Sequence, residues 1–584
     1  MEIFKIENLT FTYPENSSPA IDNISVTFKQ GEFVTLCGKS GCGKTTLLRH
    51  LKPALTPYGI RKGDILFEEK DIRELDTRKQ AQKIGYVLQS PDNQIVTDKV
   101  WHELSFGLES LGVSTGEIRS RVAEMASFFG IQDWFHKKVS NLSGGQKQLL
   151  NLASVMVMQP SVIILDEPTS QLDPIAAQDF LETIAKINRE LGTTIILSEH
   201  RLEEALPLSD RMIVMDSGKI IADGTPDSVG QILKETDNPM FKALPAPMRI
   251  HASVESELKC PVTVREGRGW LEEYSKVNTP NENLIPNDDN NTFSQVAVEL
   301  KDIYFRYEKD QPDVVEGLSL KIYQGEFYAI VGGNGTGKTT TLNILSGLIN
   351  PYSGQVKIFD EELKKYTNPY NGLLGVLPQN PQTLFVKKTV EEDLWDMLSS
   401  ADITDEEKEQ QIKEIANICE INHLMDKHPF DLSGGEQQKA ALAKVLLLKP
   451  GILLMDEPTK GIDADFKGKL AEIIYTLKNS GVTVIIVSHD IEFCAKYADR
   501  CAMFFDGKII SEDSPKKFFT GKNFYTTATN RMARGILPSA VLAEDVILAC
   551  GGKKNKKSQQ VYMTIEKYQK PQIAKVRKGI LKWL

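Results

Sequence analysis

Residues 38–45 read Gly38-Lys39-Ser40-Gly41-Cys42-Gly43-Lys44-Thr45, and residues 332–339 read Gly332-Gly333-Asn334-Gly335-Thr336-Gly337-Lys338-Thr339. Each stretch follows a short apolar run, Phe33 to Cys37 or Phe327 to Val331, that predicts a β-strand, and each leads into a helix-forming segment. In that setting the glycines let backbone amides turn toward a phosphate. The lysine reaches the outer phosphates, and the threonine hydroxyl is placed to bind Mg²⁺. The sequence therefore predicts two phosphate-binding loops on one chain.

Other motifs recur in the same order in both halves. An Asp-Glu pair ends an apolar strand twice, and its two aspartates are 290 residues apart (456 − 166). Two glutamines and two Leu-Ser-Gly-Gly segments show the same spacing (379 − 89 and 433 − 143), whereas the two histidines that follow a later strand differ by 289 (489 − 200). A repeat of this length is a duplicated domain, since solenoid units are about 20 to 50 residues long.

Composition supports an ordinary globular protein of 584 residues, with 41% hydrophobic and 25% charged side chains. The seven cysteines show no paired spacing, so neither a disulfide framework nor a zinc site is indicated, and a reducing cytosol is favoured. We see no signal-peptide pattern and no apolar run near the roughly 18 to 20 residues that span a bilayer. The net charge of −10 argues against a general nucleic-acid coat.

We expect four segments along the chain: a first nucleotide-binding domain (1–240), a linker (241–295), a second nucleotide-binding domain (296–525) and a C-terminal extension (526–584). The linker includes an Asn-, Asp- and Pro-rich stretch at 275–295. The extension ends in a tail with ten basic residues from Lys553 onward and the single acidic Glu566. Two interpretations of this tail stay open: a solvated tail, or contact with anionic lipid or an acidic partner.

Each half begins with antiparallel β structure and continues as alternating strands and helices, which predicts an α/β fold with a mainly parallel sheet. The motif order is phosphate loop, glutamine, helical insert, Leu-Ser-Gly-Gly, Asp-Glu and histidine. This order resembles the ATP-binding-cassette ATPases throughout both halves. The resemblance implies two tandem cassettes, each with a mainly parallel sheet core, an antiparallel β subdomain and a helical subdomain.

The resemblance also implies a role for each matching residue. Glu167 and Glu457 match the general base, and His200 and His489 match the histidine that contacts the γ-phosphate. Tyr13 and Tyr307 occupy the place of an aromatic ring that stacks on adenine, although Phe11 and Phe305 lie nearby and either ring of each pair could be core instead. The implied Mg²⁺ ligands are Thr45, Gln89, Asp166, Thr339, Gln379 and Asp456. The implied ATP-binding residues comprise these tyrosines and glutamines, every residue of the two loops with Thr46 and Thr340, and Ser143, Gly144, Gly145, Gln146, Asp173, Ser433, Gly434, Gly435, Glu436 and Asp463.

The Leu-Ser-Gly-Gly segments explain why two cassettes are needed. A serine hydroxyl and glycine amides that open a helix form an anion site, yet chain order puts this site far from its own phosphate loop. In the family the cassettes pack head to tail, so ATP at Lys44 is expected to be closed by Ser433, and ATP at Lys338 by Ser143. The two sites need not be equal, because Glu436, Lys460-Gly461 and Cys42 depart from the usual residues.

A finer resemblance comes from the residues after each glutamine. Gln89-Ser90-Pro91-Asp92-Asn93-Gln94 precedes Val100-Trp101-His102-Glu103-Leu104-Ser105-Phe106-Gly107, as in energy-coupling-factor importers; the match after Gln379 is partial. It implies fused ATPase subunits at the cytoplasmic face of a membrane. Their expected partners are a transmembrane coupling protein and a small membrane protein that captures a vitamin or transition-metal ion. Two other classes of tandem ATPase are the alternatives. A ribosome-acting tandem ATPase is expected to carry a long charged helical linker, and a tandem sugar-importer ATPase usually has one degraded loop.

Overall fold

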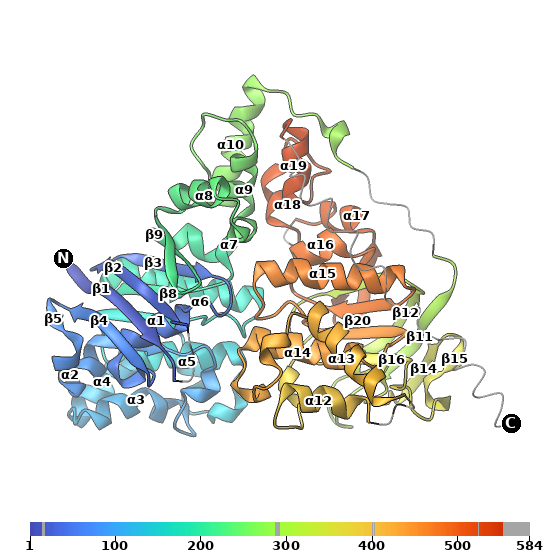
Figure 1. Cartoon of the computed structure of the whole chain (residues 1–584), viewed down its shortest axis with the longest axis horizontal. Helices are drawn as coiled ribbons and strands as arrows, with labels where there is room; N and C mark the ends of the chain where they lie inside the picture. The colour runs from blue at the N-terminus through green and yellow to red at the C-terminus, as the bar shows by residue number, and fades with distance from the viewer. Residues whose placement is uncertain (15–17, 287–292, 400, 402, 524, 553–584) are drawn as a thin grey trace. The chain divides into compact units, whose positions relative to one another are not determined.

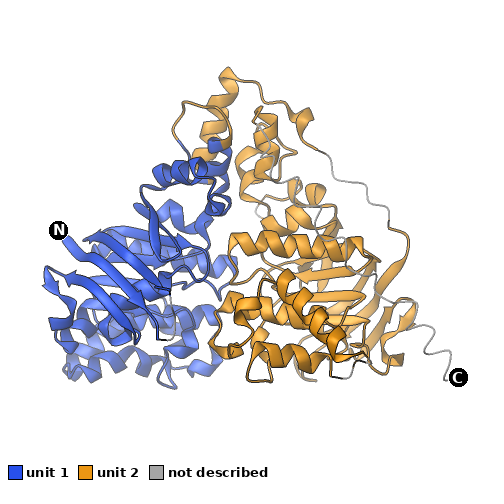
Figure 2. Cartoon of the chain, viewed as in Figure 1, with its two compact units in different colours: residues 1–252, 260–263 blue, residues 253–259, 264–584 orange. Residues whose placement is uncertain are grey.

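A computed structural model of the chain describes residues 1–14, 18–286, 293–399, 401, 403–523 and 525–552. The basic tail from Lys553 onward therefore lies outside the described residues. The chain divides into two compact units, one of residues 1–252 with 260–263 and one of residues 253–259 with 264–584 (Figure 2). Each unit carries one of the two sequence repeats.

Unit 1 contains an antiparallel sheet in the order β2-β1-β4-β5. Side chains along its second strand alternate between buried and exposed positions, which is the pattern of a sheet with one covered face. The strands are β1 (Glu2–Thr12), β2 (Ile21–Lys29), β4 (Ile60–Phe67) and β5 (Lys70–Asp71).

A six-stranded sheet, whose strands β3, β8 and β9 are labelled in Figure 1, forms the centre of unit 1. Its order is β10-β9-β3-β8-β7-β6, and all of its neighbouring pairs are parallel except β10 with β9. Every residue of β3, β7 and β8 is buried, as expected for parallel strands covered on both faces. The strands are β3 (Phe33–Gly38), β6 (Ile84–Val87), β7 (Val162–Asp166), β8 (Thr194–Ser198), β9 (Arg211–Asp216) and β10 (Lys219–Gly224).

Two apolar cores hold this sheet in place, one on each face. Because neighbouring residues of a strand point to opposite faces, Phe33 packs in one core and Val34 in the other. The Phe33 core includes the helical insert, and the Val34 core includes the antiparallel sheet. The helices of unit 1 are α1 (Lys44–His50), α2 (Thr77–Lys83), α3 (Val100–Ser110), α4 (Thr115–Phe128), α5 (Gly144–Met156), α6 (Pro174–Leu191), α7 (Leu202–Ala205), α8 (Pro226–Glu235) and α9 (Ala246–Ser253).

Unit 2 repeats this architecture. Its antiparallel sheet has the order β12-β11-β14-β15 and its central sheet the order β16-β17-β18-β13-β19-β20, where only β20 runs antiparallel to its neighbour. The strands are β11 (Val296–Phe305), β12 (Val315–Tyr323), β13 (Phe327–Val331), β14 (Ser353–Ile358), β15 (Glu361–Glu362), β16 (Leu374–Leu377), β17 (Ile452–Asp456), β18 (Thr483–Val487), β19 (Arg500–Phe505) and β20 (Lys508–Asp513). The main helices are α11 (Lys338–Ser346), α12 (Val390–Met397), α13 (Asp405–Ile418), α14 (Gly434–Leu446), α15 (Ala464–Asn479), α16 (Ile491–Tyr497) and α17 (Pro515–Thr520). The predicted fold class is confirmed: two tandem cassettes of mixed α/β structure.

The segment expected to be a linker also contains ordered helices, and α10 (Val264–Val277) packs within unit 2 against α18 (Ala528–Ala533) of the C-terminal extension. Trp270 is only 4% exposed and stacks on Tyr274. The Tyr274 hydroxyl donates to the Cys550 carbonyl (3.0 Å), just after α19 (Ala543–Ala549). The linker and the extension therefore share one small helical module. Of the described helices, none is both long and apolar enough to span a bilayer.

Candidate nucleotide sites

Both phosphate loops join the end of a central strand to the first turn of a helix. The residue before each helix is a glycine in the left-handed region, Gly43 with φ 104° before α1 and Gly337 with φ 107° before α11. A Cβ on Gly43 would lie 2.5 Å from the Ala20 carbonyl oxygen, and one on Gly337 would lie 2.5 Å from that of Val314. Both positions therefore require glycine for conformation and for space.

The loop lysines are buried inside their own loops. Lys44 is 5% exposed, and its Nζ donates to the carbonyl oxygens of Gly38 (3.0 Å) and Lys39 (3.1 Å). Lys338, also 5% exposed, makes the matching bonds to Gly332 (2.9 Å) and Gly333 (2.6 Å). Each ammonium is thus held where the loop curls around it, the position from which a lysine can neutralise phosphate oxygens.

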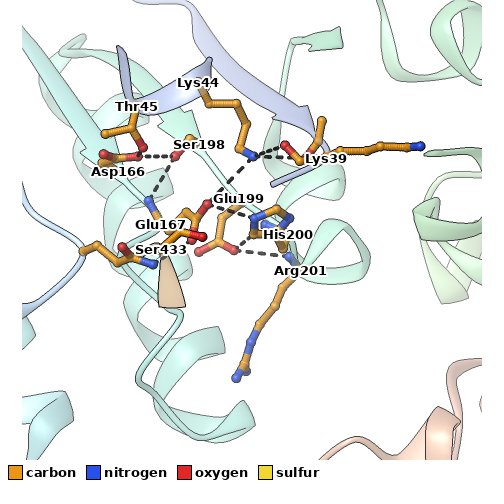
Figure 3. A network of polar contacts seen from close by, with 12 residues as sticks. Lys39, Lys44, Thr45, Asp166, Glu167, Ser198, Glu199, His200, Arg201 and Ser433 are labelled. Atoms are coloured by element: carbon orange, nitrogen blue, oxygen red, sulfur yellow. Dashed lines mark hydrogen bonds and ion pairs between the residues drawn. The ribbon is translucent and has the colours of Figure 1, made fainter. Parts of the chain in front are cut away.

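A threonine and an aspartate meet beside the first loop (Figure 3). Thr45 Oγ1 donates to Asp166 Oδ1 (3.1 Å), and Ser198 Oγ donates to the same oxygen (2.9 Å). Burial raises the pKa of the Asp166 carboxyl above its ordinary value, and the adjacent Glu167 carboxylate raises it further. A bound cation would favour the charged form of this carboxyl. A buried carboxyl of this kind is the environment expected of a metal ligand.

Glu167 lies at the centre of the first network. Its Oε2 accepts a hydrogen bond from Gln89 Nε2 (2.8 Å), and its Oε1 lies 2.8 Å from His200 Nε2 and 3.9 Å from Lys44 Nζ (Figure 3). The backbone at Glu167 has φ 46°, an uncommon conformation for a residue with a side chain. The structure therefore brings Gln89, Glu167, His200 and Lys44 together in unit 1, and their catalytic and binding roles stay predictions.

In the second repeat the glutamate and the histidine again lie together, and the glutamate is more buried. Glu457 has φ 50°, its Oε2 accepts from the His489 backbone N–H (3.1 Å), and its Oε1 lies 3.2 Å from His489 Nε2. Burial raises the pKa of Glu457 from its ordinary 4.5 to about 7. Burial also raises the pKa of the neighbouring Asp456, although a hydrogen bond from Thr339 opposes this.

The structure shows which contacts the tyrosine and the phenylalanine near each loop make. Tyr13 and Tyr307 each pair their hydroxyl with a threonine that follows the loop, Thr46 or Thr340, at 3.0 Å. Phe11 and Phe305 are buried in the apolar cores, whereas Tyr307 is 59% exposed, so in each pair the phenylalanine is the core residue. Whether the tyrosines stack on adenine stays a prediction.

The Ser-Gly-Gly segments open helices α5 and α14 with the same cap. Ser143 Oγ accepts from the Gln146 N–H (3.2 Å) while the Gln146 side chain accepts from the Ser143 N–H (2.9 Å). In unit 2 a carboxylate takes the place of that amide, because Glu436 Oε2 accepts from both the N–H (2.9 Å) and the hydroxyl (2.8 Å) of Ser433. The second segment therefore carries a negative charge beside its serine.

Asp173 and Asp463, two of the implied ATP-binding residues, are the N-caps of α6 and α15. Their carboxylates accept hydrogen bonds from the backbone N–H groups of Ala176 (2.9 Å) and Phe466 (2.9 Å). This cap fixes where each helix begins. A role in closing a nucleotide site stays a prediction.

Sequence reasoning missed Glu199, which is 2% exposed. Its carboxylate accepts from the Thr169 side chain (2.5 Å) and from the His200 backbone N–H (2.9 Å), so it holds His200 in place. A signal was present: Ser198 and Ser488 are 290 residues apart (488 − 198), but the histidines differ by 289. Glu199 is the additional residue of the first repeat.

Two loops that each hold a buried lysine beside an aspartate, a glutamate and a histidine define a P-loop ATPase of the cassette type. A family model for "ABC transporter" matches residues 21–170 and 315–460. The chain belongs to this family, and it is an ATPase with two ATP-binding domains.

Relatives extend over nearly the whole chain. A Bacillus cereus protein named as an ABC transporter ATP-binding protein is 42% identical over 94% of this chain and 98% of its own length. YkoD of Bacillus subtilis, named as an HMP/thiamine import ATP-binding protein, is 32% identical over 89% of this chain and 93% of its own length. A solved structure of cbiO1 from Clostridium perfringens, part of the ABC transporter complex cbiONQ, is 33% identical over 41% of this chain and 94% of that chain, with a TM-score of 0.37.

Proposed function

We propose that this chain hydrolyses ATP at two sites in order to drive a membrane importer for a vitamin or a transition-metal ion. The observation that carries the ATPase assignment to named residues is the network around Glu167, where Gln89, His200 and Lys44 converge on one carboxylate. In this proposal Glu167 and Glu457 accept the proton of the attacking water, and the histidines hold the glutamates and the γ-phosphate in line. Lys44 and Lys338 neutralise the outer phosphates.

The residues beside each loop fit a magnesium ion. Oδ1 of Asp456 is buried, and it has no hydrogen-bond partner among the described residues, so its lone pairs can serve a cation. Thr339 with Asp456, and Thr45 with Asp166, would hold the ion, and Gln89 and Gln379 complete the proposed set. When bound, Mg²⁺ neutralises charge on the β- and γ-phosphates. Magnesium is typically bound by one or two carboxylates together with phosphate oxygens, and it keeps several waters.

We further propose that each ATP is closed by the Ser-Gly-Gly segment of the opposite repeat. Helices α5 and α14 each begin with two glycines, and the backbone amides of a helix N-terminus suit an anion. Gly144 and Gly434 have open space where a Cβ would stand, so a phosphate oxygen can approach the backbone there. Ser433 would then face ATP at Lys44, and Ser143 would face ATP at Lys338, with Asp173 and Asp463 positioning the helices behind them.

The import assignment rests on the similarity to YkoD over most of both chains and on the residues that follow each glutamine. Trp101 and Phe106 on helix α3 are 38% and 40% exposed, and Val96 in the loop before it is 67% exposed. Apolar side chains gathered on one exposed helix and its loop favour contact with another protein. We propose that a short helix of a transmembrane coupling protein docks there and in the matching region of unit 2. The chain would act as a peripheral protein on the cytoplasmic face.

Two experiments test these proposals. ATPase assays of Glu167→Gln and Glu457→Gln should each show a large loss of turnover, and full activity in either variant would contradict two working, coupled sites. Co-purification then tests the partner: the full chain should bring down a transmembrane protein, and restoring that complex in vesicles should give ATP-dependent uptake. Recovery of ribosomal RNA instead would favour the ribosome-acting alternative.

A further inference from the structure

A buried ion pair in unit 2 takes no part in the proposed chemistry. Lys444 on α14 and Asp393 on α12 are 4% and 1% exposed, and Lys444 Nζ lies 2.6 Å from Asp393 Oδ1. Charged groups are rarely buried this fully, and a buried pair needs further hydrogen bonds to offset the loss of water.

Those further bonds go to one loop. Lys444 Nζ also donates to the Leu384 carbonyl oxygen (2.6 Å), and the Val386 N–H donates to Asp393 Oδ1 (3.1 Å). The ion pair is therefore hydrogen-bonded to the backbone of the loop that runs from Gln379 to α12. Lys444 sits on the same helix that Ser433 opens, so α14, α12 and this loop meet at one buried ammonium.

The first repeat joins the same parts differently. Positions 290 residues earlier hold Ser154 and Glu103, so the carboxylate is kept and the lysine is not. Glu103 Oε2 accepts from the Val96 N–H (3.1 Å) and the Thr97 N–H (2.8 Å), whereas the Ser154 hydroxyl donates within its own helix to the Asn151 carbonyl (2.9 Å). There α5 reaches the backbone on both sides of Gln89 through neutral amides: Asn151 Nδ2 donates to the Pro91 carbonyl (3.1 Å) after it, and Gln148 Nε2 donates to the Leu88 carbonyl (3.2 Å) before it.

We propose that Lys444 is a positioning residue that transmits movement of α14 to the loop after Gln379. This inference rests on the proposed function, because α14 would be displaced when ATP engages Ser433. A helix of 13 residues moves as a stiff rod, and a charged hydrogen bond at its far end pulls the Leu384 backbone with it. Asn151 does the corresponding work in unit 1 with a neutral bond.

The test measures amide hydrogen exchange by mass spectrometry on the full chain, with and without Mg²⁺ and the non-hydrolysable analogue AMP-PNP. In the wild type, nucleotide should slow exchange at residues 382–388 about fivefold or more. In Lys444→Met/Asp393→Asn this slowing should fall below about twofold. The asparagine keeps an oxygen for the Val386 N–H, so the double variant removes both charges and leaves no buried carboxylate unpaired.

Two controls separate transmission from general loosening. Lys444→Arg keeps the cation and should retain the nucleotide effect at 382–388. Asn151→Leu should lose the effect in the loop after Gln89 and keep it at 382–388. The proposal would be overturned if nucleotide slowed exchange at 382–388 as much in the double variant as in the wild type. It would also be overturned if nucleotide did not slow exchange there in the wild type. Failure of nucleotide to protect residues 38–45 in the wild type would instead refute the proposed ATP site.

Discussion

Glu457 is expected to be protonated over much of the neutral range in the free protein. Its pKa is raised from 4.5 to about 7 because the carboxyl is only 7% exposed. A general base must be ionised to accept a proton. With a pKa near 7, the ionised share is about 10% at pH 6 and about 90% at pH 8; a surface glutamate would be almost fully ionised throughout.

Activity at the second glutamate should therefore fall as the pH drops below about 7. The assay is kcat/KM for ATP between pH 5.5 and 9 in the Glu167→Gln background, because kcat/KM reports the pKa values of the free enzyme. The acid limb should have its midpoint near pH 7. A midpoint at or below pH 5.5 would show that burial does not control this carboxyl and would refute the reasoning.

The raised pKa of Glu457 also affects the stability of the folded protein, which should decrease as the pH rises. Since the folded-state pKa lies above the unfolded value, the folded state binds more protons between pH 4.5 and 7, and stability is lost as the pH rises through that window. The full cost is about 3 kcal/mol, at about 1.4 kcal/mol for each pKa unit. Glu457→Gln removes the ionising group, so its stability advantage over the wild type should grow by about 2 kcal/mol between pH 5.5 and 8. Calorimetric unfolding measures this, with the exposed Glu406→Gln as the control that should show no such growth.

Four further outcomes are expected. Glu436→Gln removes the negative charge beside Ser433 and should lower the KM for ATP severalfold, an effect that steady-state ATPase assays detect and that high salt should reduce. Replacing Lys44 and Lys338 together by alanine should abolish nucleotide binding in equilibrium titrations, whereas chelation of Mg²⁺ should abolish turnover in the wild type and be reversed by added Mg²⁺. Trp270→Ala should destabilise the helical module of unit 2 by about 3 to 5 kcal/mol, because it empties a buried aromatic site. Faster hydrogen exchange in α18 would report this, and Val277→Ala, at a position 86% exposed, should change nothing.

The sequence was sufficient for the central sheet and for the residues around each loop. The apolar run before the second phosphate loop predicted Phe327–Val331 with the observed bounds, because buried parallel strands are continuous apolar segments. The structure brings Gln89, Glu167 and His200 together because each follows a strand of the same sheet, and the carboxyl ends of parallel strands share an edge.

Other features depended on contacts that no local pattern encodes. Helix α10 carries polar residues on most of its surface, and its buried stripe of Trp270, Leu271 and Tyr274 acquires meaning only from a partner about 260 residues later in the chain. The pairing of Lys444 with Asp393 is equally non-local, because each residue alone reads as an ordinary surface charge. Glu199 was visible only as a one-residue change in repeat spacing.

The shared helical module also sets an order for biosynthesis. Helix α10 leaves the ribosome before any strand of the second repeat, yet α18 and α19, which cover it, are synthesised after that repeat is complete. The apolar side of α10 therefore stays exposed while more than 200 residues (528 − 277 = 251) are translated. Premature termination before α18 would leave the connecting helix without its cover and would also remove Val541 from the apolar core of unit 2, a state suited to capture by chaperones or proteases.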